Sequence, residues 1–345
     1  MNIKIEQVDK RIWDEIKHVI PENIFDFHIH SFLDNSFYGD VPDSLRVYLP
    51  CDIDTVLYNM QLIFPERKCT GIITGWPCTT SDLIKQNNYA ADSAKKNNLF
   101  FLALVNPLMD NLYLEDIVKK KECVGLKPYK CFAKNPEDAR ITDYLTMKQV
   151  EIANKYGLVI TLHLSRRPGI SDSLNLEDLY YLSEKYPDVV WNLAHCGRSF
   201  IPEYIEDAVG SLKQLMKRNI YLDTAAVTDS EVFTIVFSEF GSEKILYGSD
   251  IPVAFLRGRC VGFGYDWAFI AEETHSITAS FPVAPALLVY EQIKAMCRAF
   301  KKTGFIMSDI ERIFFRNSEQ IVRKIIKKKD KKIKEADRQS KRNRK

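Results

Sequence analysis

The feature that most constrains the fold is a regular alternation of short apolar segments with segments of helical spacing. Eight segments predict strands, at residues 25–30, 69–74, 99–105, 123–128, 158–164, 189–195, 220–224 and 244–250. Helices are predicted after them, at 51–63, 81–97, 113–121, 146–156, 176–186, 204–217 and 231–240. Parallel strands need crossover helices of this length, so the pattern predicts an α/β fold, a closed (β/α)₈ TIM barrel. A doubly wound open sheet is the alternative, but no Gly-x-Gly-x-x-Gly turn follows the first strand.

Further segments frame this predicted barrel. A short helix at 9–20 precedes it, and helices at 290–301 and 309–324 close it. Residues 251–285 show no regular pattern and are rich in glycine and aromatic residues. Long loops at the top of a barrel are usually functional, so we expect a lid or a wall over a site there.

The first strand carries apolar and polar side chains on opposite faces. It reads Phe-Asp-Phe-His-Ile-His over 25–30, so His28 and His30 share one face. Polar groups at the C-terminal end of a barrel strand face the mouth, where such barrels keep their chemistry. The alternative is a half-buried surface strand with two incidental histidines. The chain holds only six histidines, and the residues below give these two partners.

Polar residues also end other predicted strands. His163 closes the fifth strand, His195 the sixth and Asp250 the eighth. Each has a structural explanation on its own, as a hydrogen-bonded histidine or as the start of a turn. In a barrel, however, all three converge with His28 and His30 at one mouth. Imidazoles with a carboxylate fit a divalent transition metal; zinc is the usual choice, and manganese or iron fits the same donors.

Cationic side chains are predicted beside this centre. Lys127 ends the fourth strand, and strand alternation points it inward. Arg166 and Arg198 follow the fifth and sixth strands, where guanidinium groups can pair with a carboxylate. The alternative for both arginines is an ordinary surface position. A small anionic substrate, a carboxylic acid, is the partner that these cations predict.

Taken together, these motifs resemble the amidohydrolase superfamily. The residues that show the resemblance are His28-Ile29-His30, His163, His195 and Gly248-Ser249-Asp250-Ile251-Pro252. Within the superfamily they are most similar to the branch that includes aminocarboxymuconate-semialdehyde decarboxylase. Residues 310–319 resemble the closing helix of that branch, so the likeness spans 24 to about 322. The resemblance implies a distorted barrel with one or two metals, ligated by His28, His30, His163 and Asp250. It places His195 close to the metal-bound water or the substrate.

The predicted chemistry is water activation by a metal. A metal with an open position lowers the pKa of bound water, so that hydroxide can attack a carbonyl. Asp250 can then take the proton, while His195 polarises the carbonyl or shares the proton transfer. We therefore predict a hydrolase of a C–O or C–N bond; a non-oxidative decarboxylase and an inactive, ligand-binding barrel remain alternatives. In some amidohydrolases a lysine at the position of Lys127 is carbamylated and bridges two metals, which is an alternative to its pairing with an anion.

Charge is distributed unevenly along the chain. The net charge is +2, but residues 323–345 hold thirteen basic and three acidic residues, which leaves +10 there and −8 on residues 1–322. We therefore expect one barrel domain over 1–322 and a disordered basic tail over 323–345. The tail has no interleaved aromatic residues, so we expect a solvated appendage rather than a nucleic-acid partner; nucleic-acid or membrane binding by the tail is the alternative.

Cysteine usage and hydropathy bear on the compartment. The eight cysteines form no Cys-x-x-Cys pair, and the N-terminus does not resemble a signal segment, so we expect a cytoplasmic protein with reduced thiols. No apolar run reaches the roughly 20 residues that a membrane-spanning helix needs. A homodimer is compatible with such a barrel, but no stretch indicates one.

Overall fold

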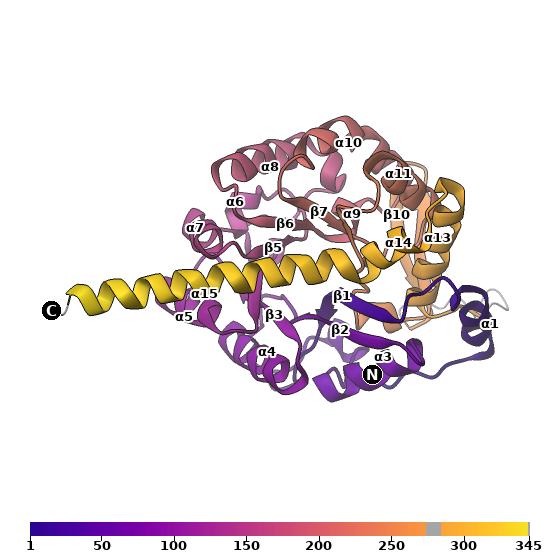
Figure 1. Ribbon diagram of the computed structural model, residues 1–345. Helices are drawn as coiled ribbons and strands as arrows, with labels where there is room; N and C mark the ends of the chain where they lie inside the picture. The colour runs from indigo at the N-terminus through magenta and orange to yellow at the C-terminus, as the bar shows by residue number, and fades with distance from the viewer. Residues whose placement is uncertain (274–283, 344–345) are drawn as a thin grey trace.

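The sequence folds into a barrel. A computed structural model describes residues 1–273 and 284–343. Within these ranges, eight parallel strands follow one another in a single sheet in the order β1 to β8, with helices around it (Figure 1). This confirms the predicted TIM barrel and excludes the doubly wound sheet, whose strand order would not be consecutive.

Several strands end earlier than predicted. Their bounds are β1 (Asn23–His30), β2 (Lys68–Thr74), β3 (Phe100–Val105), β4 (Cys123–Pro128), β5 (Val159–Leu162), β6 (Val190–Leu193), β7 (Ile220–Asp223) and β8 (Ile245–Leu246). His163, His195 and Asp250 therefore lie just beyond the ends of their strands, in the loops at the barrel mouth.

Helices connect the strands. They are α1 (Gln7–Ile16), α2 (Asp43–Arg46), α3 (Ile53–Ile63), α4 (Leu83–Asn97), α5 (Asn111–Lys119), α6 (Ile141–Tyr144), α7 (Met147–Tyr156), α8 (Ser173–Lys185), α10 (Pro202–Leu215), α11 (Ser230–Phe240), α13 (Leu288–Thr303), α14 (Met307–Glu311) and α15 (Asn317–Asn343). Several begin at an aspartate whose side chain accepts a backbone N–H of the first turn, which stabilises the helix start. These caps are Asp52, Asp82, Asp110, Asp172 and Asp229.

A hairpin follows the barrel. Strands β9 (Gly258–Phe263) and β10 (Asp266–Ala271) pair antiparallel, so the prediction that residues 251–285 are irregular is wrong for this part. Gly264 makes the turn with a φ of +61°, a conformation that glycine adopts without strain. Residues 274–283 of the same predicted segment lie outside the described residues.

The first and last strands meet through the predicted site residues. The N–H of Asp250 donates to the carbonyl of His28 at 2.9 Å, and the N–H of His30 donates to the carbonyl of Ile251 at 2.6 Å. The N–H of Phe27 also donates to the carbonyl of Tyr247, at 2.8 Å, so the backbone of residues that would hold a metal supplies part of the barrel closure.

Helix α15 crosses the N-terminal end of the barrel, its floor, and runs on beyond the body (Figure 1). Ile321, Val322 and Ile325 are buried against the barrel. The predicted disorder of the tail is wrong for residues 323–343, which are helical. The division of the chain at residue 322 remains a prediction. None of the helices in the described residues is long and apolar enough to cross a membrane.

One lysine fastens α15 to the floor. Lys329 is 1% exposed, and its ammonium donates to three backbone carbonyls of the α5–β4 connection, those of Lys120, Lys121 and Cys123. We expect Lys329→Met to lower the free energy of unfolding by about 2–4 kcal/mol, because buried carbonyls lose their donor. Urea unfolding measures this. The exposed Lys331→Met is the matched control, with an expected change below about 0.5 kcal/mol; equal effects would contradict the anchoring role.

Candidate metal centre

A cavity of about 210 Å³ opens at the C-terminal end of the barrel. It brings together residues that span more than 200 positions of the sequence. Its lining consists of His28, His30, Tyr48, Trp76, Pro77, Lys127, Tyr129, His163, His195, Asp250 and Val253. The predicted convergence of four histidines, Asp250 and Lys127 on one mouth thus matches the geometry, while their individual roles remain predictions.

Three of these residues are close enough to share one ion. His28, His30 and Asp250 each offer a donor atom, and these atoms lie within 4.8 Å of one another. Asp250 Oδ1 is 3.4 Å from His28 Nε2 and 3.5 Å from His30 Nε2. Donors spaced in this way can surround an ion at the roughly 2.0–2.2 Å typical of zinc.

The imidazole rings are oriented for ligation. The Nδ1 atoms of His28, His30 and His195 each face an acceptor, at 3.1, 2.8 and 2.8 Å, namely Asp223 Oδ2, Gly75 O and Ala225 O. An acceptor at Nδ1 keeps the proton on that nitrogen and leaves the lone pair on Nε2. Metal-binding histidines are held by this kind of second contact. The residues present therefore fit a metal.

The protonation states suit the same role. Burial lowers the pKa of His28, lowers that of His195 to about 4, and lowers that of His163 well below its usual value. Burial would raise the pKa of Asp250, but the neighbouring histidines outweigh it and lower this pKa to about 2. Neutral imidazoles and an ionised carboxylate are the forms that bind a metal.

His163 faces the cavity from the loop after β5. Its ring lies 4.7 Å from the ring of Tyr129 and 5.2 Å from that of His195, measured between centroids. Among the described residues there are two close groups of possible ligands, His28 with His30 and Asp250, and His28 with His195 and Asp223, and His163 belongs to neither. Its Nδ1 is buried with no hydrogen-bond partner in the described part of the chain. A buried polar atom without a partner is costly, so His163 is ready for a ligand or a metal that satisfies it.

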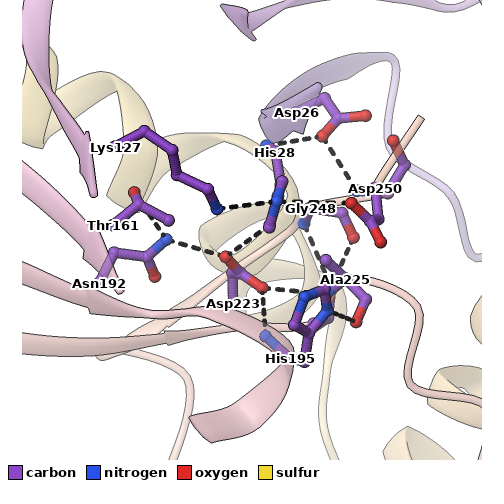
Figure 2. A network of polar contacts seen from close by, with 12 residues as sticks. Asp26, His28, Lys127, Thr161, Asn192, His195, Asp223, Ala225, Gly248 and Asp250 are labelled. Carbon is purple, nitrogen blue, oxygen red and sulfur yellow. Dashed lines mark hydrogen bonds and ion pairs between the residues drawn. The ribbon is translucent and has the colours of Figure 1, made fainter. Parts of the chain in front are cut away.

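Lys127 points inward, as strand alternation predicts. Its Nζ lies 3.2 Å from His28 Nε2 (Figure 2). Burial lowers the pKa of Lys127 to about 8. Within the described residues no carboxylate oxygen forms an ion pair with this ammonium. The N–H donors of Lys127 that do not face His28 are therefore available to a ligand in the cavity.

Asp223, at the end of β7, is the residue that the sequence analysis missed. It is fully buried and accepts from His28 Nδ1, from Asn192 Nδ2 at 2.8 Å and from the N–H of His195 at 2.8 Å (Figure 2). Burial alone would raise its pKa, but His28 and His195 lower it well below the usual range. The sequence did contain a signal for this residue: Asp223 is a carboxylate near the C-terminal end of the strand predicted at 220–224, where site residues are expected.

A left-handed turn ends β6. His195, Cys196, Gly197 and Arg198 have φ values of 58°, 51°, 71° and 65°. Non-glycine residues pay for this conformation with roughly 1–2 kcal/mol each, so it persists only where the surroundings enforce it. The bond from the His195 N–H to Asp223 is one such constraint. The turn directs the His195 ring into the cavity.

The same loops hold both predicted arginines away from the cavity. Arg198 is buried, and its Nη1 donates to the carbonyls of Leu164 and Arg166, both at 2.9 Å. Arg166 donates to the carbonyl of Asp138 at 2.6 Å. Neither side chain lines the cavity. The geometry therefore gives the predicted contact of Arg166 and Arg198 with substrate no support; both tie loops together.

The hairpin β9–β10 reaches the site through aromatic rings. Trp267 of β10 lies 4.2 Å from Phe200, which lies 5.4 Å from the His195 ring, between centroids. The guanidinium carbon of Arg167 lies 4.3 Å from the centroid of the Trp267 ring, and Arg167 also pairs with Asp266. The hairpin thus forms part of the wall behind His195, which agrees with the wall expected from residues 251–285.

Comparisons with known proteins found one family model and several solved structures with the same fold. A family model described as amidohydrolase matches residues 62–276. A search of curated proteins gave no significant match. Solved structures with the same fold include a 2,6-dihydroxybenzoate decarboxylase complexed with 2,6-dihydroxybenzoate, at 14% identity and a TM-score of 0.55, covering 88% of this chain and 99% of that one.

Two further solved structures are similar. One is a probable 2-pyrone-4,6-dicarboxylic acid hydrolase from Acinetobacter baumannii with citric acid bound, at 15% identity, a TM-score of 0.54, and coverage of 87% and 99%. The other is a dihydroxybenzoic acid decarboxylase from Polaromonas sp. JS666 with manganese and 2-nitroresorcinol, at 16% identity, a TM-score of 0.52, and coverage of 88% and 97%. At these identities the likeness shows the shared barrel fold.

Proposed function

The chain belongs to the amidohydrolase family, and from this premise we propose that it is a metal-dependent hydrolase. Its substrate is a small carboxylic acid in which a C–O or C–N bond is cleaved. The observation that carries the proposal is the close grouping of His28, His30 and Asp250 in a cavity of about 210 Å³, with Nδ1 of both imidazoles held by an acceptor.

These three residues would hold a divalent metal, with His163 beside them. Zinc is our first choice for two imidazoles and a carboxylate, and the manganese in one similar structure makes manganese the second. The bound metal supplies Lewis acidity and makes a nucleophile available from water at neutral pH.

The chain's own residues divide the remaining tasks. Asp250, ionised because its pKa is low, accepts the proton of the attacking water and returns it to the leaving group. His195 has its proton on Nδ1, bonded to Ala225, so its Nε2 can only accept. This favours a share in proton transfer over polarisation of a carbonyl. Lys127 offers its ammonium to the substrate carboxylate.

Decarboxylation is the second candidate. The cavity walls include Tyr48, Trp76 and Tyr129, which suit a planar ring, and two of the similar structures above are dihydroxybenzoate decarboxylases. Protonation of a ring carbon needs a group that carries a proton at the start, whereas Asp250 is ionised because its pKa is lowered to about 2, and it must first take a proton from water. We therefore place hydrolysis first.

Product analysis separates the two reactions. The chain, supplied with Zn²⁺ or Mn²⁺, is incubated with small lactones, esters and amides of carboxylic acids and with hydroxybenzoic acids. Our proposal expects water addition without release of carbon dioxide. A lactone then gains 18 mass units, and an ester or amide gives two products whose summed mass is 18 units above that of the substrate. Carbon dioxide release from the hydroxybenzoic acids alone would replace hydrolysis by decarboxylation.

Lys127 has a separate prediction. We expect Lys127→Met to lower kcat/KM for the anionic substrate by about a hundredfold or more, mainly through KM, while one metal per chain is retained, because the ammonium binds substrate and not metal. Elemental analysis and steady-state kinetics measure this. Two metals per chain, one lost in the variant, would instead show that Lys127 is carbamylated and bridges them.

Partners and compartment follow from the same proposal. The partner that we propose is a small anionic substrate. No feature of the described residues indicates a dimer of this chain. All eight cysteines are free thiols, as a reducing compartment would keep them. A homodimer and a cytoplasmic location remain predictions.

A further inference from the structure

The exposed side of α15 carries a continuous row of cations. Lys324, Lys327, Lys331, Lys334 and Arg338 follow one another at intervals of three and four residues, and all five are exposed. Side chains at such intervals lie on one face of a helix. At 1.5 Å per residue the row is roughly 21 Å long, with about 5 Å between neighbours. We call these five residues the basic row.

The basic row is hardly neutralised by the rest of the protein. Its one ion pair with a described residue is that of Lys331 with Glu335, at 3.9 Å. The opposite face of the helix, which includes Ile325 and Lys329, is packed against the barrel floor. The cations are thus held in line, at the end of the barrel opposite the cavity.

More positive charge lies beside the row. The field of Lys324 helps to lower the pKa of Lys244, after burial. Lys244 in turn lines a hollow of about 440 Å³ together with Lys217 and Arg218. Glu184 in this hollow pairs with Arg218. The floor around α15 is therefore positive, although residues 1–322 carry −8 in total.

We propose that the basic row binds the phosphate backbone of duplex nucleic acid. A straight row of evenly spaced cations matches a linear polymer with evenly spaced charges better than a single anion. The row contains no aromatic residue for stacking on unpaired bases, so contact is with the backbone and independent of sequence. The absence of aromatic residues made nucleic-acid binding only the alternative in the sequence analysis, but the helical spacing supplies a site for the phosphate backbone without them.

A membrane surface fits less well. Helices that lie on a bilayer bury apolar residues beside their cations. Here the apolar face points away from the basic row and is occupied by the barrel floor. The exposed side of α15 offers no large apolar side chain for insertion among lipids over residues 323–336, whose side chains the structure describes. The proposal does not depend on the reaction at the cavity and extends beyond it.

The test uses the full chain and a dye-labelled 20-base-pair duplex of arbitrary sequence, followed by fluorescence anisotropy. With five phosphate contacts, affinity should fall by roughly several-hundredfold between 50 and 200 mM KCl. A variant in which Lys327, Lys331, Lys334 and Arg338 are all replaced by Gln should bind at least about 30-fold more weakly at 50 mM KCl and lose most of the salt dependence. Glutamine keeps the helix propensity of these exposed sites.

A second variant serves as the matched control. It has the same net charge, with glutamine at four exposed lysines elsewhere, Lys10, Lys95, Lys301 and Lys302. We expect its affinity to stay within about threefold of that of the unsubstituted chain. Arginine in place of Lys327, Lys331 and Lys334 should preserve binding. Equal losses in both glutamine variants would overturn the proposal. So would equal or tighter binding, at the same salt, to phosphatidylserine vesicles or to polyglutamate.

Discussion

Replacing Asp250 by Asn is expected to lower kcat by about 10²–10⁴-fold and to reduce the metal content well below one per chain. The variant keeps the size of the side chain but removes its charge, and with it both a ligand and the proton acceptor. The lost proton transfer alone accounts for a factor of this size. Elemental analysis of protein purified without chelator, together with turnover of the substrate found in the product screen, measures both effects.

The control for this experiment is Asp229→Asn. Asp229 caps α11 and does not line the cavity, and Asn caps a helix about as well as Asp. Metal content and kcat should therefore be unchanged. Full metal and full activity in Asp250→Asn would refute the assignment of this residue. If the unsubstituted protein bound no metal, whichever divalent metal was added, the inactive, ligand-binding barrel would be the better interpretation.

Asp223 supports the second large prediction. We expect Asp223→Asn to weaken metal binding by about 10–100-fold, because the His28 Nδ1–H loses a charged acceptor and the ring its fixed orientation. Asp223→Ala should in addition lower the free energy of unfolding by about 3–5 kcal/mol, since buried donors on Asn192 and His195 then lose their partner. Competition with a fluorescent chelator gives the affinity, and urea unfolding gives the stability.

Comparison of the two Asp223 variants separates position from packing. The asparagine retains an oxygen that can accept from the His195 N–H, so its fold should be close to the original. If metal affinity fell only in proportion to stability, Asp223 would be a structural residue alone. If the asparagine variant bound metal as tightly as the original, the carboxylate would not act through His28.

The barrel and its mouth were predictable because both follow from repetition. Strand alternation needs only local periodicity, and it placed His28, His30 and Lys127 on the correct face. Parallel barrel strands all end at the same side, so residues distant in sequence, such as His195 and Asp250, could be brought together by topology alone.

Side chains in irregular backbone could not be placed in this way. Arg198 follows a strand, as a substrate-binding residue would, but four consecutive left-handed residues turn its guanidinium toward backbone carbonyls. The hairpin 258–271 was missed because its strands carry little apolar alternation. The order of the C-terminal tail depends on Lys329, whose partners lie some 200 residues earlier in the chain.

The closure of the barrel bears on how the chain can be made. His28 and Asp250, whose backbones join the first strand to the last, stand 222 residues apart. A ribosome that adds about 5–20 residues per second needs roughly 10–45 s to travel between them. During that time the backbone edge of β1 that faces the last strand has no partner, and an unpaired strand edge is open to aggregation or to a chaperone. A nascent chain that stops short of residue 250 would thus lack the site together with the last seam of the barrel.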